Sequence, residues 1–403
     1  MKFYQEKLAN GLSIIGEYNE TAVSSALGFF VRTGSRDETP EISGVSHFLE
    51  HMMFKGTARR SALELTYEMG SIGAQANAFT SEENTVYYMA VLPEYFEQAM
   101  DILCDMLRPA LDQHEFDTEK KVILEEIALY QDKPLHVMYE AGLKEYFGEH
   151  KAGNSILGTT ESVSAISREQ MLSYFNQRYS PSNMVLGVAG NFEWPKVLEM
   201  ANRYCAHWTK YDTARDLTPH APRLSNKVLS KENLQLSHIC YFAPGPSATD
   251  ERRYAAQVLS MIMGDSTGSR LYWELIDKGL AESASIDADD MDNAGFILGY
   301  ASCLPEMLDQ VAGILKQVML SAGDFNEADL ERAKNKFGTR LVLQAESSLR
   351  RLLSVGVDWL YQPRYLSLQD ELKIIAELKE SDLRELLNSF SFNPVTEVRM
   401  IPA

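Results

Sequence analysis

Two histidines and a glutamate lie within one pentapeptide, His47-Phe48-Leu49-Glu50-His51. If this segment is helical, residues at i, i+3 and i+4 project from one face. Two neutral imidazoles one turn apart can share a tetrahedral zinc ion, and Glu50 can then take a proton from a water on the metal. The alternative is a helix that carries two histidines by chance, which is uncommon in a chain with only 8 His.

The residues around the pentapeptide favour a buried helix. Val45, Met52 and Met53 continue the apolar pattern that Phe48 and Leu49 begin. Buried imidazoles and a buried carboxylate need a partner that offsets their lost hydration, and a metal ion is such a partner.

A catalytic zinc held by two histidines needs one more protein ligand, an Asp, Glu or His on another element. The remaining histidines, at positions 114, 136, 150, 207, 220 and 238, lie in polar or loop-like surroundings, and none stands out. The segment from Glu119 to Tyr130 reads as a helix with Glu125 and Glu126 on or beside its apolar face. On these residues alone, ordinary solvated carboxylates are the simpler interpretation of both.

The chain resembles the pitrilysin and mitochondrial processing peptidase family of zinc endopeptidases over nearly its whole length. The order His-x-x-Glu-His is the inverzincin pattern. The resemblance also rests on the segments MMFKGT (52–57), NAFT (77–80), TVYY (85–88), VILEEI (122–127), YSPSNM (179–184) and VAGN (188–191).

This resemblance implies the ligand set and the roles of the acidic residues. His47, His51 and Glu126 would hold Zn²⁺, with water in the open position. Glu50 would be the general base, and Glu119 would support the site from outside the ligand shell.

The resemblance also implies a place for the substrate. Asn77, Ala78 and Phe79 fall in a stretch similar to the family's substrate-binding edge, where an extended peptide would add as another strand. Without the resemblance, Asn77-Ala78 reads as an ordinary turn between strands.

Composition excludes several classes of partner. The net charge of −19 argues against nucleic acid or an anionic membrane, since both need a basic face. Acidity would attract a substrate with Lys and Arg, or it merely keeps the protein soluble. No apolar run approaches the roughly 20 residues of a membrane span.

The compartment is inferred from the N-terminus and the cysteines. The chain moves directly into a hairpin pattern around Asn10-Gly11, so neither a signal nor a transit peptide is expected. Cys104, Cys205, Cys240 and Cys303 have no metal-like spacing and sit in apolar contexts, which favours reduced thiols over disulfides. A cytoplasmic location is therefore expected.

An internal repeat indicates two homologous halves. The segment LPEYFEQAMDIL (92–103) reappears as LPEMLDQVAGIL (304–315). The junction is expected at 212–226, where a Pro-rich stretch breaks regular structure, giving a zinc-bearing domain 1–215 and a homologous domain 226–403 without a zinc site. Strands expected at 26–32, 85–91, 238–243 and 296–301, with amphipathic helices between them, predict an α+β fold of two α/β-sandwich domains.

The second half lacks the catalytic residue types. Gln257, Ser260 and Met261 stand where the histidines and glutamate would be. Members of the family that act alone usually carry an Arg and a Tyr seven residues apart in this half, to hold the substrate backbone and polarise the scissile carbonyl. The corresponding stretch from Ile276 to Glu282 is one residue shorter and has neither. Arg270 is present, but the family keeps it as part of the packing pattern, and a surface Arg at a helix entry is the simpler interpretation.

The expected protein is therefore a zinc endopeptidase subunit that cleaves extended peptides or unfolded polypeptides. It would pair with a related subunit that carries the Arg and Tyr, or with a second copy of itself. Two other classes remain open: a non-catalytic scaffold subunit, and a peptide-binding module with structural zinc, although structural zinc normally has four protein ligands.

Overall fold

The strands form two mixed sheets in a computed structural model that describes residues 1–403. The six-stranded sheet has the order β1 (Lys2–Lys7), β2 (Ser13–Tyr18), β6 (Met184–Gly190), β3 (Ser25–Val31), β5 (Thr85–Val91), β4 (Gln75–Thr80). The five-stranded sheet has the order β7 (Ser225–Lys231), β11 (Thr396–Pro402), β8 (Ser237–Pro244), β10 (Ala294–Cys303), β9 (Ser283–Met291). All pairs are antiparallel except β2 with β6 and β7 with β11.

The two sheets repeat one topology, as the internal repeat predicts. β2, β6, β3, β5 and β4 correspond in order and direction to β7, β11, β8, β10 and β9. β2 begins at Ser13 and β7 at Ser225, and the same displacement separates Met184 in β6 from Thr396 in β11. The α+β fold of two homologous domains is thus confirmed.

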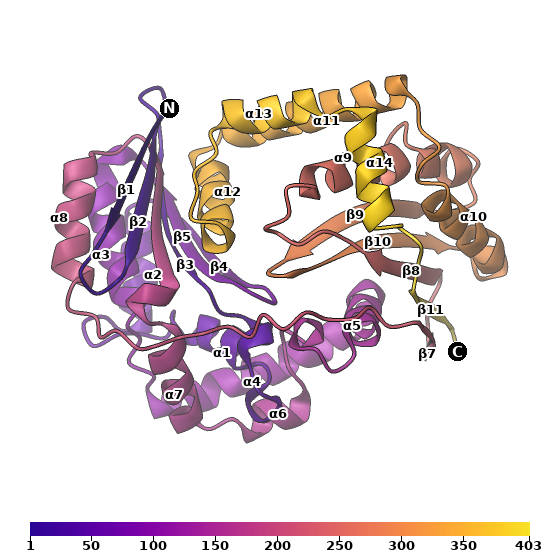
Figure 1. The fold of residues 1–403 in the computed structure, drawn as a ribbon. Coiled ribbons are helices and arrows are strands. Elements are labelled where there is room, and N and C mark those ends of the chain that lie inside the picture. The colour runs from indigo at the N-terminus through magenta and orange to yellow at the C-terminus, as the bar shows by residue number, and fades with distance from the viewer. The chain divides into compact units, whose positions relative to one another are not determined.

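Each sheet belongs to one of two units of the chain (Figure 1). Unit 1 comprises Met1–Ala128, Ser155–Asp216 and Val342–Ser367, and unit 2 comprises Leu129–Asn154, Leu217–Leu341 and Leu368–Ala403. The helices of unit 1 are α1 (Val45–Met52), α2 (Ala62–Ser71), α3 (Phe96–Met106), most of α4 (Gln113–Gln131), α6 (Thr160–Ala165), α7 (Arg168–Arg178), α8 (Trp194–Cys205) and α12 (Ser348–Tyr361). Those of unit 2 are α5 (Pro134–Phe147), α9 (Arg253–Gly264), α10 (Leu308–Leu320), most of α11 (Glu327–Ala345), α13 (Leu368–Glu377) and α14 (Glu380–Ser389).

The units differ from the contiguous halves because each includes one helix from the other half. α12 lies in the second half of the sequence but packs on β3 and β6 of unit 1, and α5 lies in the first half but packs on β8 and β11 of unit 2. The division at 1–215 and 226–403 remains a prediction about the homologous repeats. The segment 209–224 between them has no regular structure.

A glycine permits each exchanged helix to approach its sheet closely. A Cβ on Gly356 of α12 would lie 2.1 Å from the Phe30 ring, and a Cβ on Gly142 of α5 would lie 2.2 Å from the Phe242 ring. Real Cβ atoms do not approach other atoms so closely, so the two positions require glycine. No helix is both long enough and apolar enough to cross a membrane.

Candidate metal centre

Helix α1 carries the His-x-x-Glu-His motif, and its start is fixed by the carboxyl group of a residue outside the helix. Glu38 accepts hydrogen bonds from the backbone N–H groups of Gly44 and Ser46, both at 2.7 Å. These are among the N–H groups that a helix leaves unsatisfied at its N-terminus. Burial raises the pKa of Glu38 to about 8, against the lowering effect of these donors. Glu38 was missed in the sequence because its spacing from the helix matches no common capping pattern.

The apolar face of α1 is buried and brings the helix against α4. Val45, Phe48 and Leu49 are fully buried, and the Phe48 ring stacks on Phe116 of α4 with centroids 4.8 Å apart. Because the two helices meet along this face, the acidic residues of α4 come to lie beside the histidines of α1.

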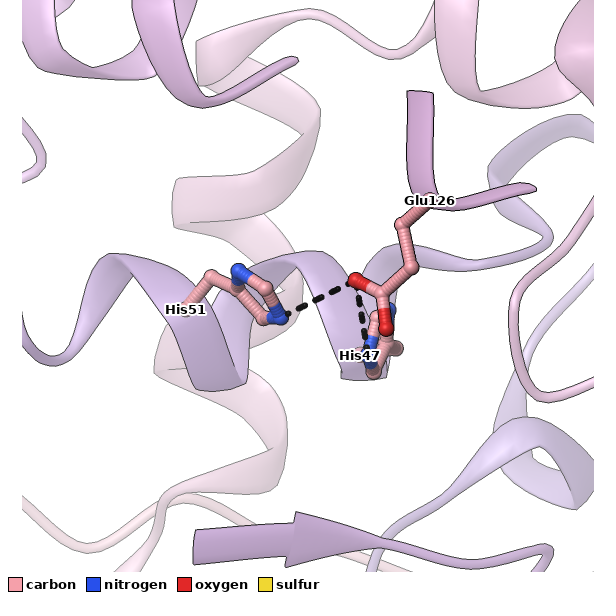
Figure 2. Close-up of side chains that lie close together, drawn as sticks. All are labelled: His47, His51 and Glu126. Atoms are coloured by element: carbon pink, nitrogen blue, oxygen red, sulfur yellow. Dashed lines mark ion pairs between the residues drawn. The ribbon is translucent and has the colours of Figure 1, made fainter. Parts of the chain in front are cut away.

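The three predicted ligands converge (Figure 2). His51 Nε2 lies 3.5 Å from Glu126 Oε2, and His47 Nε2 lies 3.9 Å from the same oxygen. One donor atom from each residue falls within 4.8 Å of the others, and this is the only such group of His, Cys, Asp or Glu in the chain. Tetrahedral zinc ligands with bonds near 2.05 Å are about 3.3 Å apart, so small side-chain movements suffice to hold the ion.

Glu119 orients His51 from the side away from the ligand group. His51 Nδ1 lies 2.8 Å from Glu119 Oε1, and Lys55 Nζ lies 2.5 Å from Glu119 Oε2. Burial acts to raise the pKa of Glu119, but the bonds to His51 and Lys55 outweigh it and lower the pKa. An ionised Glu119 keeps the proton of His51 on Nδ1 and leaves Nε2 free to bind metal. Lys55 is a contact that the sequence did not suggest.

The two imidazoles differ in their surroundings. Burial acts to lower the pKa of His51, but Glu119, Glu126 and Glu50 outweigh it and raise the pKa. Burial, aided by His51, lowers the pKa of His47 to about 3, which keeps that imidazole neutral. His47 Nδ1 is buried without a hydrogen-bond partner, so no second group orients this ring.

Glu50 lies beside the ligand group and is held by the edge strand. Its Oε2 accepts a hydrogen bond from Thr80 Oγ1 of β4 at 2.6 Å. Burial raises the pKa of Glu50, the Thr80 bond lowers it, and the net shift is upward. A raised pKa makes a carboxylate a better proton acceptor near neutral pH.

The residues predicted to bind substrate lie on β4, which is the edge of its sheet. Asn77 and Phe79 are exposed, and Ala78 is half-buried. β4 pairs with β5 along one side only, so its other side has free backbone groups. Asn77-Ala78 therefore lies within a strand and is not a turn. Glu125 is exposed, whereas Glu126 on the next position faces the histidines.

The second unit offers no equivalent chemistry. Gln257, Ser260 and Met261 lie in α9 and form no metal-binding group. Ile276 packs against the hydrophobic core, and Glu282 is exposed before β9.

Comparisons with known proteins identify the family of the chain. Residues 13–160 match the family model described as insulinase (peptidase family M16), and residues 165–337 match the peptidase M16 inactive domain. An uncharacterized zinc protease of Bacillus subtilis is 33% identical, with 96% of this chain and 94% of that protein covered. A similarly named protein of Rickettsia felis is 31% identical, with 99% and 97% covered.

The fold recurs in solved structures. A protease from Helicobacter pylori superposes with a TM-score of 0.91 at 22% identity, covering 100% of this chain and 99% of that one. The peptidase M16 inactive domain structure from Pseudomonas fluorescens superposes with a TM-score of 0.93 at 16% identity, with the same coverage. The chain belongs to peptidase family M16, the insulinase and pitrilysin family.

Proposed function

We propose that this chain is a zinc-dependent endopeptidase subunit that hydrolyses extended peptides. The single observation that carries the proposal is the convergence of His47, His51 and Glu126 beside Glu50. The relatives' names, which call them zinc proteases, support zinc as the metal. Two nitrogen donors and one carboxylate, with no fourth protein ligand, suit a catalytic site because one position stays open.

Each side chain has a distinct task in this proposal. Zn²⁺ supplies Lewis-acid chemistry, which acidifies water and polarises a peptide carbonyl. Glu50 takes the proton of the attacking water and later delivers it to the leaving amine. Thr80 holds Glu50 in place, and Glu119 with Lys55 holds His51.

The free edge of β4 is the proposed substrate site. A peptide that adds to this edge uses main-chain hydrogen bonds, so it must be extended, and side-chain pockets have a secondary role. Because Thr80 belongs to the same strand and bonds Glu50, a peptide along β4 passes close to the general base.

The proposed subunit depends on a partner for donors to the developing oxyanion. The Arg and Tyr that act in family members working alone are replaced by Ile276 and Glu282. Ile276 is partly buried against the hydrophobic core, so Ile276→Arg would partly bury a charge and cannot simply restore the missing donor. A related subunit that carries both donors fits better than a second copy, which lacks them too.

The test is Glu50→Gln, which removes the base but no ligand. We expect zinc content and fold to be unchanged and peptide turnover to fall by about 10² to 10⁴. Glu125→Gln, an exposed carboxylate on α4, is the matched control and should keep both zinc and turnover. Activity of Glu50→Gln within a few-fold of wild type would refute the assigned role.

The two non-catalytic alternatives give different outcomes in the same assay. A scaffold subunit would bind no zinc and show no turnover. A peptide-binding module would keep zinc and bind peptide, without cleavage under any condition.

A further inference from the structure

Two buried thiols far apart in the sequence lie in contact within unit 1. Cys104 Sγ of α3 and Cys205 Sγ of α8 are 3.6 Å apart. Cys104 is 3% exposed and Cys205 is fully buried. Cys240 and Cys303 of unit 2 are also buried free cysteines, but neither contacts another sulfur atom. The four cysteines thus comprise one close pair and two isolated thiols.

A cation lies beside the close pair. Arg108 stacks on the Trp208 ring, 3.5 Å from its centroid, and burial lowers the pKa of its guanidinium to about 10, against the raising effect of Cys205 and Cys104. Burial raises the pKa of Cys104, Asp101 acts in the same direction, and Arg108 acts against them. Burial therefore keeps the Cys104 thiol protonated in the closed fold, and the Arg108 guanidinium acts in favour of its thiolate.

Both cysteines lie near the ends of their helices. Cys205 is the last residue of α8, and Cys104 is in the last turn of α3. Leu103, Met106 and Leu107 around Cys104 are also buried, so a small reagent reaches the sulfur atoms only when this helix end opens locally.

We propose that Cys104 and Cys205 are a modification site, a dithiol that forms a reversible intramolecular disulfide with low-molecular-weight disulfides such as oxidised glutathione. The sulfur atoms must approach from 3.6 Å to about 2.05 Å, a shift within reach of side-chain rotation and small helix movements.

In this thiol–disulfide exchange, the small disulfide is the oxidant that accepts the two electrons. One protein thiol loses its proton and attacks a sulfur of the reagent, whose S–S bond breaks to release one small thiol. The second protein thiol loses its proton and attacks the mixed disulfide, releasing the other small thiol. Two protein thiols are oxidised, one small disulfide is reduced, and the two protons end on the released thiols.

The disulfide would cross-link unit 1 next to a residue that bonds the segment following helix α1. Asp105, next to Cys104, accepts hydrogen bonds from Thr57 Oγ1 at 2.8 Å and Arg60 Nη1 at 2.9 Å. Thr57 and Arg60 belong to the segment after α1. A disulfide constrains the unfolded chain, so oxidation should stabilise unit 1. The two cysteines are not among the predicted metal ligands, so zinc should stay bound.

The experiment equilibrates the folded, zinc-loaded full chain in glutathione buffers of increasing oxidised fraction. After an acid quench, unfolded samples are titrated for free thiols and mapped by mass spectrometry. We expect two of the four thiols to disappear, a peptide that joins Cys104 to Cys205, full reversal by dithiothreitol, and Tm raised by roughly 5 °C. Cys104→Ser should form no intramolecular disulfide, and Cys240 and Cys303 should remain thiols throughout.

Three outcomes would overturn the proposal. These are retention of all four thiols in oxidised buffer, stable glutathione adducts without the cross-link, and disulfides between chains. Mapping of the wild-type chain decides among them even if Cys104→Ser fails to fold.

Discussion

At the scale of residues, the metal centre depends on three side chains from two helices. Glu125, the residue before Glu126, is a matched control for substitutions of these ligands. His47→Ala, His51→Ala and Glu126→Gln should each strongly weaken zinc binding, because each removes one of only three protein ligands. Glu125→Gln should bind zinc like wild type, since Glu125 is exposed and does not belong to the group of converging ligands. Elemental analysis of the four purified variants measures this directly.

The same four variants also test the assignment of Glu126 as the third ligand. If Glu126→Gln kept a full complement of zinc while Glu125→Gln lost it, the ligand would be one residue away from the position assigned here.

At the scale of elements, Glu38 makes the stability of helix α1 depend on pH. Its pKa is raised from 4.5 to about 8 in the fold, so the native state binds this proton more tightly than the unfolded chain. This contribution to stability is complete below pH 4.5 and is lost as pH rises through 8. The contribution of Glu38 to the free energy of unfolding should therefore fall by up to about 1.4 kcal/mol per pH unit in this window.

The measurement is denaturant unfolding between pH 5 and 8 in a chelator, which removes any contribution from zinc. Glu38→Gln should make the fall of stability with rising pH less steep than in wild type, because the amide does not titrate. Glu41→Gln, which changes an exposed carboxylate nearby, should leave the slope as in wild type. An identical slope in Glu38→Gln would show that Glu38 does not titrate in this window.

The exchanged helices give a second prediction for elements. Gly356→Ala should destabilise the protein by about 1 to 3 kcal/mol, because the added methyl overlaps the Phe30 ring. Gly313→Ala, in α10 with open space at its Cβ position, should be neutral or slightly stabilising. Thermal unfolding of both variants tests this, and equal Tm values would mean that α12 does not pack as closely as described.

At the scale of the whole molecule, the sequence predicted the repeated α+β fold but not the exchange of helices. The strand patterns and the repeat at 92–103 and 304–315 are local signals, and they were sufficient for the fold class. The apolar faces of α5 and α12 indicate that each packs on a sheet, but a periodic pattern does not say which sheet. The pairing becomes visible only in the structure, where Gly356 lies against Phe30 and Gly142 against Phe242.

In the candidate site, too, some residues could be predicted from local sequence patterns and others could not. His47, Glu50 and His51 were predicted from their spacing, since one helix fixes all three. Glu126 and Glu119 needed the family resemblance, because their distance to α1 is set by tertiary packing. Glu38, Lys55 and the contact between Cys104 and Cys205 were missed because nothing local in the sequence encodes them.

The dependence on a partner is also a property of the whole molecule. This chain alone should cleave peptides slowly, because removing one preorganised donor to an oxyanion typically costs about 10² to 10³ in rate. An equimolar mixture with a related subunit that has the Arg and Tyr but a degenerate metal helix should restore the rate. Full activity of the isolated chain at every concentration, unchanged in the mixture, would show that the partner is not needed.

The central claim is that this chain supplies zinc chemistry for peptide hydrolysis. The most direct test measures the cleavage of an unstructured peptide by the subunit mixture. Cleavage is measured first with metal, then after a chelator has removed the metal, and then after Zn²⁺ has been added back. We predict that cleavage disappears with the metal, returns with about one Zn²⁺ per chain, and never returns in Glu50→Gln. Cleavage that persists after zinc is removed, or that Glu50→Gln retains, would contradict the account.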